Sequence, residues 1–113
     1  MEGLAAQGKL RYYGASNYKA ERLAAAWKYA KRSGIQGFSA VSNQWSPLRE
    51  NPAHVSGDPT LVKFTDQLEF PLFRKTGMSF VPYHITAGGY LAKKAAGTLT
   101  QAQAALHDNC HNN

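Results

Sequence analysis

Apolar side chains recur at helical spacing over residues 20–33, and this is the clearest pattern in the chain. Lysine, arginine and glutamate mostly take the other faces, and the apolar positions are Ala20, Leu23, Ala24, Trp27 and Ala30. Gly34 follows, and glycine readily adopts the left-handed conformation that ends a helix. The pattern therefore predicts a helix that stops at Gly34.

A short segment rich in aromatic residues precedes this helix. Residues 10–16 predict a strand, and Asn17 after it is a favourable N-cap residue for the helix. Residues 2–8 are typical of the tail of an earlier helix that ends at Gly8. The first part of the chain thus predicts a helix end, a strand and a helix.

A second strand and helix follow, separated by a long connection. Residues 38–43 predict the strand, and residues 45–59 are polar and contain prolines. Connections of that length in compact domains often carry function. Asp66 and Glu69 have the spacing of a capping box, which predicts a helix over residues 66–76.

The last part of the chain predicts one more strand and two short helices. The expected segments are a strand at 78–83, helices at 90–95 and 100–106, and a frayed polar tail at 108–113. Gly97 separates the two helices. We expect one α/β unit over residues 1–97, and a C-terminal helix and frayed tail over residues 98–113.

Strands that alternate with helices predict an α/β fold of about three consecutive parallel βα units joined by right-handed crossovers. The pattern leaves open whether the sheet is an open, doubly wound sheet or part of a barrel. In both, ligands bind where the carboxyl ends of the strands meet the following loops. Those ends are polar, and they are Ser16-Asn17, Asn43-Gln44 and Tyr83-His84.

The net charge of +6 raises the alternative of nucleic-acid binding. The basic residues instead punctuate or end the predicted helices, where they complement the helix dipole or face solvent. No nucleic-acid-binding motif accompanies them. We therefore expect no nucleic-acid partner.

The cysteine content and the apolar runs narrow the class of protein further. Cys110 is the only cysteine, so an internal disulfide and a thiolate zinc site are excluded. No window approaches the roughly 18 uninterrupted apolar residues of a membrane helix, and no signal peptide is visible. We expect a cytoplasmic location and no membrane contact. His107 and His111 have helical spacing, but without a third ligand they do not predict a metal site.

Three segments together resemble the aldo/keto reductase family. GKLRYYGASN (residues 8–17) is similar to the family's "GKIRYIGVSN" strand, and FSAVSNQWSPL (residues 38–48) to "FVSVQNEYSLL". VPYHITAGGYL (residues 81–91) resembles "LPYSPLAGGLL". The resemblance implies that the α/β unit is a partial (β/α)8 TIM barrel and that its cofactor is NADP.

The resemblance also implies contacts to the nicotinamide ring. Ser16 and Asn17 match the pair that binds the carboxamide, and Tyr83 matches the aromatic residue that stacks beneath the ring. The family glutamine on the second strand is replaced by Ser42, and Gln44, two residues on, shares its face if the strand continues. The alternatives left open are that Asn17 only caps a helix, that Gln44 is a solvent-facing loop residue, and that Tyr83 belongs to the core.

The loop after the third strand is expected to hold the pyrophosphate. His84 and Thr86 stand where the family has serine and leucine. Gly88 and Gly89 let the backbone approach a phosphate closely, although a glycine pair alone is a weak signal.

The resemblance places the catalytic tyrosine, aspartate, lysine and histidine on strands that precede this segment. We therefore expect a fragment of a reductase with part of an NADP site, no catalytic residue of its own and no activity alone. Open sheet edges predict self-association or poor solubility. The alternative function is a non-enzymatic half-barrel that self-associates or binds a dinucleotide.

Overall fold

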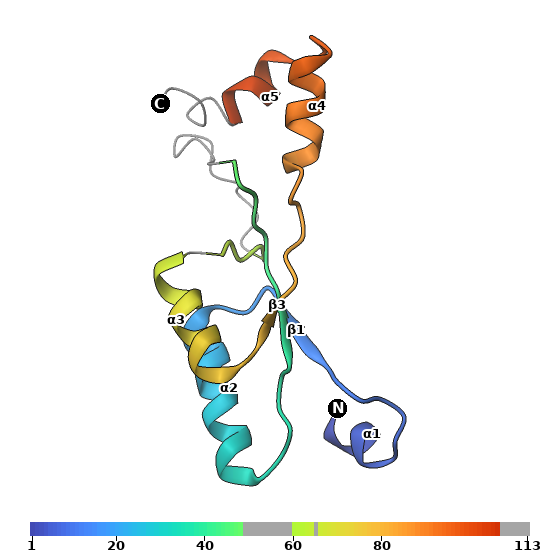
Figure 1. Ribbon diagram of the computed structural model, residues 1–113, viewed down its shortest axis with the longest axis vertical. Helices are drawn as coiled ribbons and strands as arrows, with labels where there is room; N and C mark the ends of the chain where they lie inside the picture. The colour runs from blue at the N-terminus through green and yellow to red at the C-terminus, as the bar shows by residue number, and fades with distance from the viewer. Residues whose placement is uncertain (49–59, 65, 107–113) are drawn as a thin grey trace.

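Three parallel strands form the centre of the molecule in the computed structural model, which describes residues 1–48, 60–64 and 66–106. The strands are β1 (Gly14–Ser16), β2 (Ala40–Ser42) and β3 (Ser79–Phe80), in the order β1-β2-β3 (Figure 1). Ala15 pairs with Val41, and Val41 pairs with Phe80. The parallel βα order expected from the sequence is confirmed.

Two helices cover one face of this sheet. Helix α2 (Ala20–Ser33) joins β1 to β2, and α3 (Asp66–Thr76) precedes β3. They pack side by side on the same face (Figure 1), as right-handed crossovers between parallel strands require.

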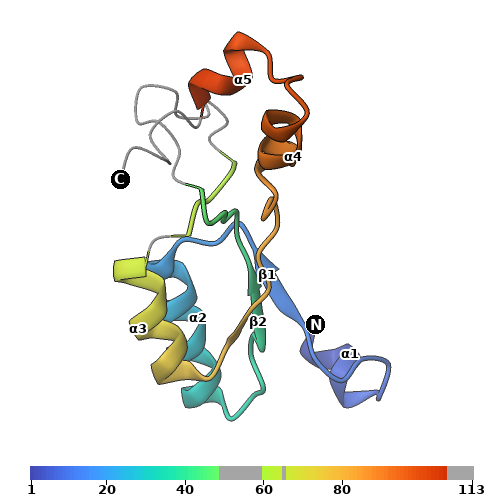
Figure 2. The same cartoon turned by 45° about the horizontal axis from the view of Figure 1, so that its top comes forward.

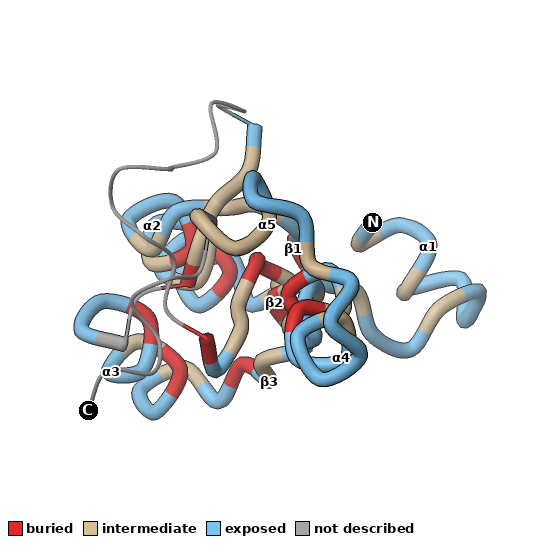
Figure 3. Tube along the Cα trace, turned by 90° about the horizontal axis from the view of Figure 1, so that it is seen from above, coloured by how far each residue is buried: buried red, intermediate tan, exposed pale blue. Residues whose placement is uncertain are grey.

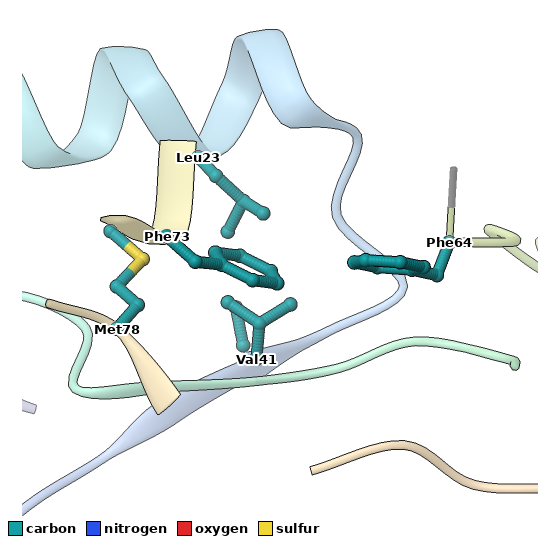
Figure 4. Close-up of a cluster of buried hydrophobic side chains, with 6 residues drawn as sticks. Leu23, Val41, Phe64, Phe73 and Met78 are labelled. Atoms are coloured by element: carbon teal, nitrogen blue, oxygen red, sulfur yellow. The ribbon is translucent and has the colours of Figure 1, made fainter. Parts of the chain in front are cut away.

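The main hydrophobic core lies between these helices and the sheet. Leu23 of α2 and Val41 of β2 are fully buried. Figure 4 shows them around the ring of Phe73, with Met78 and Phe64 on either side. Alternate side chains along a strand point to the same face of the sheet. Ala15 and Phe80 therefore belong to this core as well.

The other face of the sheet carries small residues, and no helix of the described part of the chain covers it. Gly14, Ser16 and Ser79 are exposed there, and Val81 just after β3 is 57% exposed. Three parallel strands with helices on one face are what a segment of a (β/α)8 barrel looks like, because the inner face of a barrel sheet is filled only when the barrel closes.

The N-terminal helix lies apart from this core. Helix α1 (Glu2–Ala6) has no buried residue, and Met1 and Leu4 are exposed. It ends at Ala6, two residues before the expected Gly8, which has the left-handed φ of 69°. The Lys9 amide donates to the carbonyl of Leu4. Figures 1 and 3 show this helix away from the sheet. One Glu2 carboxylate oxygen accepts a hydrogen bond from the Gly37 amide.

The C-terminal elements form a second, smaller cluster at the opposite end. They are η2 (Ala87–Gly89), α4 (Tyr90–Ala95) and α5 (Gln101–Leu106). Figure 2 shows α4 and α5 away from the three strands. Tyr90 and Ala87 pack with Leu48 and Leu99. The molecule is consequently elongated, with extents of 53 × 28 × 24 Å. The tail predicted to fray, with His107, Cys110 and His111, lies outside the described residues.

Two expectations from the sequence need correction. The strands are shorter than the segments 10–16, 38–43 and 78–83, although single hydrogen bonds extend the pairing, such as Tyr83 N–H to the Asn43 carbonyl. Asn17 is not the N-cap of α2, which is Lys19. The Asn17 side-chain oxygen instead accepts hydrogen bonds from residues far along the chain, the Val62 amide and the Tyr83 hydroxyl. These two donors take the place of the backbone amide that an N-cap side chain would bind.

In the part of the chain that the structure describes, no helix combines the length and apolar character needed to cross a membrane.

Candidate functional site

The carboxyl ends of the three strands meet at one edge of the sheet. The Asn17 amide donates to the carbonyl of Ser42 at 3.2 Å, and the Tyr83 amide donates to the carbonyl of Asn43 at 3.3 Å. The Trp45 amide donates to the carbonyl of Tyr83 at 3.1 Å. Residues that are far apart in sequence therefore lie side by side where a ligand of an α/β sheet binds.

Asn17 and Tyr83 are in direct contact. The Tyr83 hydroxyl donates to Asn17 Oδ1 at 2.6 Å across 66 residues of sequence. The Val62 amide donates to the same oxygen at 3.3 Å. Asn17 has φ of 57°, a left-handed conformation that asparagine tolerates better than most residues. This conformation turns its side chain toward Tyr83.

Ser16 is also in contact with Ser42, through the backbone carbonyl of Ser42. Ser16 Oγ donates to the carbonyl of Ser42 at 2.9 Å. The same carbonyl accepts the amide of Asn17. The Ser16 side chain is exposed on the uncovered face of the sheet, whereas the neighbouring Ala15 is buried in the core.

Gln44 extends β2 by pairing on both sides. It forms parallel bridges with Tyr83 and with Lys63. Since Ser42 and Gln44 are two residues apart in this extended strand, they share one face, and Tyr83 shares it through its pairing. Gln44 is only 9% exposed. The alternative interpretation, that it is a solvent-facing loop residue, is wrong.

Residues 60–64 belong to the site and were missed by the sequence analysis. Gln44 donates its amide to the carbonyl of Val62, and the Phe64 amide donates back to the carbonyl of Gln44. This segment lies beside the extension of β2, on the side where β1 has ended, and the Val62 amide bonds to Asn17. The sequence signal was the run Leu61-Val62-Lys63-Phe64, whose residues favour a strand inside a polar connection.

Asn43 has a structural role. It is fully buried, and its Nδ2 donates to the carbonyl of Tyr18 at 3.0 Å. The bond ties the end of β2 to the segment that leads into α2. It therefore fixes the strand ends without facing the site.

The loop after β3 continues from Tyr83 toward η2. His84 is exposed and has φ of 68°, and Thr86 is exposed at the N-cap of η2. His84 and Gly88 line a hollow of about 150 Å³ together with Lys93 of α4 and Gln103 of α5. Of the residues expected at the pyrophosphate, His84 and Gly88 thus line one hollow together with a cation, Lys93, whereas Thr86 does not line it.

Over residues 1–48, 60–64 and 66–106, no group of three or more histidine, cysteine, aspartate or glutamate side chains is arranged to hold a metal ion. The pair His107 and His111 lies outside these ranges.

Comparison with known proteins gives one match. The model of the aldo/keto reductase family matches residues 1–112. No curated protein and no solved structure matches the chain.

Proposed function

Because this chain belongs to the aldo/keto reductase family, we propose that its strand-end site binds the nicotinamide end of NADP. The observation that carries the proposal is the hydrogen bond from the Tyr83 hydroxyl to Asn17 Oδ1. It joins two residues that the resemblance assigns to the same ring, one to its carboxamide and one to its face.

The chemistry of the site suits a flat aromatic amide. A carboxamide needs both a donor and an acceptor, and Ser16, Asn17 and Gln44 supply side chains of both kinds. Ser42 lies between them on the same face of β2 and leaves space, since its side chain is small. The ring of Tyr83 is half-buried, and in our proposal it stacks beneath the nicotinamide.

The loop after Tyr83 is proposed to hold the pyrophosphate. His84, Thr86 and Gly88 lie along it, and Lys93 adds a positive charge beside His84 and Gly88. Lys93 and Lys94 both lie in the last turn of α4, which therefore carries two cations. The Lys94 ammonium lies 5.9 Å from the ring centroid of Tyr90. Basic side chains beside an anionic group favour its binding.

The family is an oxidoreductase family, and carbonyl reduction requires a proton donor within contact distance of the carbonyl. We propose that this chain, taken alone, supplies cofactor contacts and not that donor. The Tyr83 hydroxyl does not take that role, because its proton is directed at Asn17. The purified chain should accordingly bind NADPH without reducing an aromatic aldehyde, and turnover above background would contradict this.

Titration with NADPH, followed by tryptophan fluorescence, tests the binding. Trp45 is next to Gln44 and its amide bonds to Tyr83, so its emission should change on binding. Tyr83→Ala should weaken binding roughly tenfold or more, since a stacked aromatic ring contributes on the order of 1–3 kcal/mol. Tyr29→Ala, at an exposed position on α2, is the control and should bind like the wild type. Equal binding by both variants would reject the assignment.

A second candidate function is a module that associates with its own copies. Two observations favour it. Val81 is 57% exposed on the uncovered face of the sheet. An apolar hollow of about 490 Å³ lies against α2, where Tyr29 meets Tyr13 before β1 and Phe38 before β2. Sheet edges that are neither paired nor covered promote pairing between chains. The two candidates are compatible because they use different surfaces. The cofactor would bind at the carboxyl ends of the strands, whereas copies of the chain would pair along the outer strands of the sheet.

A further inference from the structure

The hollow of about 490 Å³ against α2 is separate from the strand-end site. Three alanines of α2, Ala25, Ala26 and Ala30, line it together with aromatic side chains. None of the residues assigned to the nicotinamide or to the pyrophosphate lines it. Small-molecule sites are typically hollows of roughly 300–1,000 Å³ with mostly apolar walls and a few polar groups. The hollow therefore has the size and the lining of a ligand site of its own.

The aromatic side chains of the hollow are already packed against one another. Phe38 meets Tyr13 edge to face with the ring centroids 5.7 Å apart, and it meets Tyr18 in the same way at 5.6 Å. The Ser39 amide donates to the Tyr13 carbonyl at 2.9 Å, which ties the segment before β2 to the segment before β1. An aromatic ligand would therefore meet rings that are held in place before it binds, so that little ordering is lost on binding.

Gly37 lines the hollow where the chain leaves α2. It has φ of 72°, and a Cβ there would lie 2.7 Å from the side chain of Ala30. Glycine thus lets this segment lie close against the helix. The Gly37 amide donates to a Glu2 carboxylate oxygen at 3.1 Å, which places a negative charge beside this end of the hollow. An anionic group of a ligand is consequently disfavoured here.

Arg22 gives the other end of the hollow a positive charge. Among the described residues, it is the only charged side chain that lines the hollow, and its neighbour Glu21 does not line it. The guanidinium lies 4.1 Å from the ring centroid of Tyr18, so the charge is held against an aromatic ring. From Arg22 to Ala30 the helix rises roughly 12 Å. The hollow is therefore polarised along α2, positive near Arg22 and negative near Gly37.

We propose that this hollow binds an aromatic carboxylate, with the carboxylate at Arg22 and the rings among Phe38, Tyr29 and the alanines of α2. A guanidinium offers the fork of N–H donors that suits a carboxylate. The charge of Glu2 at the far end sets the direction of the ligand, and the rise of roughly 12 Å admits two fused rings with an acid group. The site uses other residues than the cofactor site and does not rest on the proposed function.

Titration of the purified chain with 2-naphthoate, followed by NMR, tests this site. Ring currents of the bound naphthalene should shift the methyl signals of Ala26 and Ala30. The matched ligand is 2-naphthylmethanol, which has the same rings and no charge. The wild type should prefer the carboxylate roughly fivefold, the worth of an ion pair at the surface, and less in high salt. Equal affinity for the two compounds would overturn the proposal.

Substitutions on α2 test the residues that carry the proposal. Arg22→Gln keeps a long polar side chain without the charge and should bind the two compounds alike. Arg32→Gln, on the same helix but outside the hollow, is the matched control and should keep the preference. Ala26→Leu fills the hollow with a good helix former and should abolish binding while the circular dichroism stays that of the wild type. Retained preference in Arg22→Gln, or wild-type binding by a folded Ala26→Leu, would contradict the proposal.

Two further measurements separate this site from the other proposed uses of the chain. Tyr29→Ala should weaken binding of 2-naphthoate and leave NADPH binding unchanged, whereas Tyr83→Ala should do the reverse. Competition between the two ligands would show that the hollow is not a separate site. Self-association through the open face of the sheet leaves the affinity for 2-naphthoate unchanged. An affinity that falls in step with dimer formation would assign the hollow to a second copy of the chain and overturn the proposal.

Discussion

At the scale of single residues, the site is held by Asn17. Its side-chain oxygen accepts from Val62 and from Tyr83, residues 45 and 66 positions away. The local sequence, a polar residue before a helix, predicted an N-cap, and that prediction was wrong because α2 begins only at Ala20. Local propensity cannot reveal donors that only the folded sheet brings into range.

The contact between Asn17 and Tyr83 predicts a measurable contribution to stability. Tyr83→Phe keeps the ring and removes the hydroxyl, so it should lower the free energy of unfolding by about 1 kcal/mol. Tyr29→Phe is the matched control, because Tyr29 is 58% exposed, and it should change stability by less than about 0.5 kcal/mol. Urea denaturation measures both, and equal midpoints for the two variants would show that the bond contributes nothing.

Tyr83 itself was assigned from its motif, and its neighbours confirm that it lies at the strand ends. The position of Ser16, Asn17, Ser42, Gln44 and Tyr83 along one sheet edge could be predicted, because parallel strands end on the same side. Their hydrogen bonds could not, since the polarity of each side chain depends on partners such as the Ser42 carbonyl.

At the scale of elements, the helices were easier to predict than the strands. α2 and α3 end where a glycine follows them, Gly34 with φ of 62° and Gly77 with φ of 74°. The strands proved shorter because their length depends on pairing with neighbours rather than on composition. Residues 62–64 pair with Gln44 for the same non-local reason, and nothing in their own sequence states which strand they meet.

The close approach of β1 and β2 gives an element-scale prediction. A Cβ at Gly14 would lie 2.6 Å from the backbone oxygen of Ala40, so the strands would have to separate. Gly14→Ala should therefore cost about 1–3 kcal/mol, as overpacking does. Gly3→Ala on α1 meets nothing within 4 Å and should be neutral or slightly stabilising. Thermal unfolding of both variants decides the matter, and a neutral Gly14→Ala would mean that β1 and β2 pair differently.

At the scale of the whole molecule, one face of the sheet is packed and the other is open. Leu23, Val41 and Phe73 fill the packed side, and Gly14, Ser16 and Ser79 are exposed on the other. The α/β class and the βα order followed from the sequence. The elongated arrangement, with α1 at one end and α4 and α5 at the other, did not, because it depends on which surfaces find partners within this chain.

The open face predicts self-association. Size-exclusion chromatography with light scattering should show a species larger than the 12.4 kDa chain at tens of micromolar protein. Val81→Lys places a charge on that face and should shift the population toward the monomer. Leu91→Lys, at a similarly exposed position on α4, should not. A monomeric wild type would contradict the predicted self-association.

The central claim is that the described strand ends contact the nicotinamide end of the cofactor. Saturation-transfer NMR on the purified chain with NADP tests it most directly, because it reports which ligand protons lie against the protein. The account predicts stronger transfer to the nicotinamide ring protons than to those of adenine, and loss of that difference in Tyr83→Ala. Equal transfer to both ends, or transfer to adenine alone, would contradict the account.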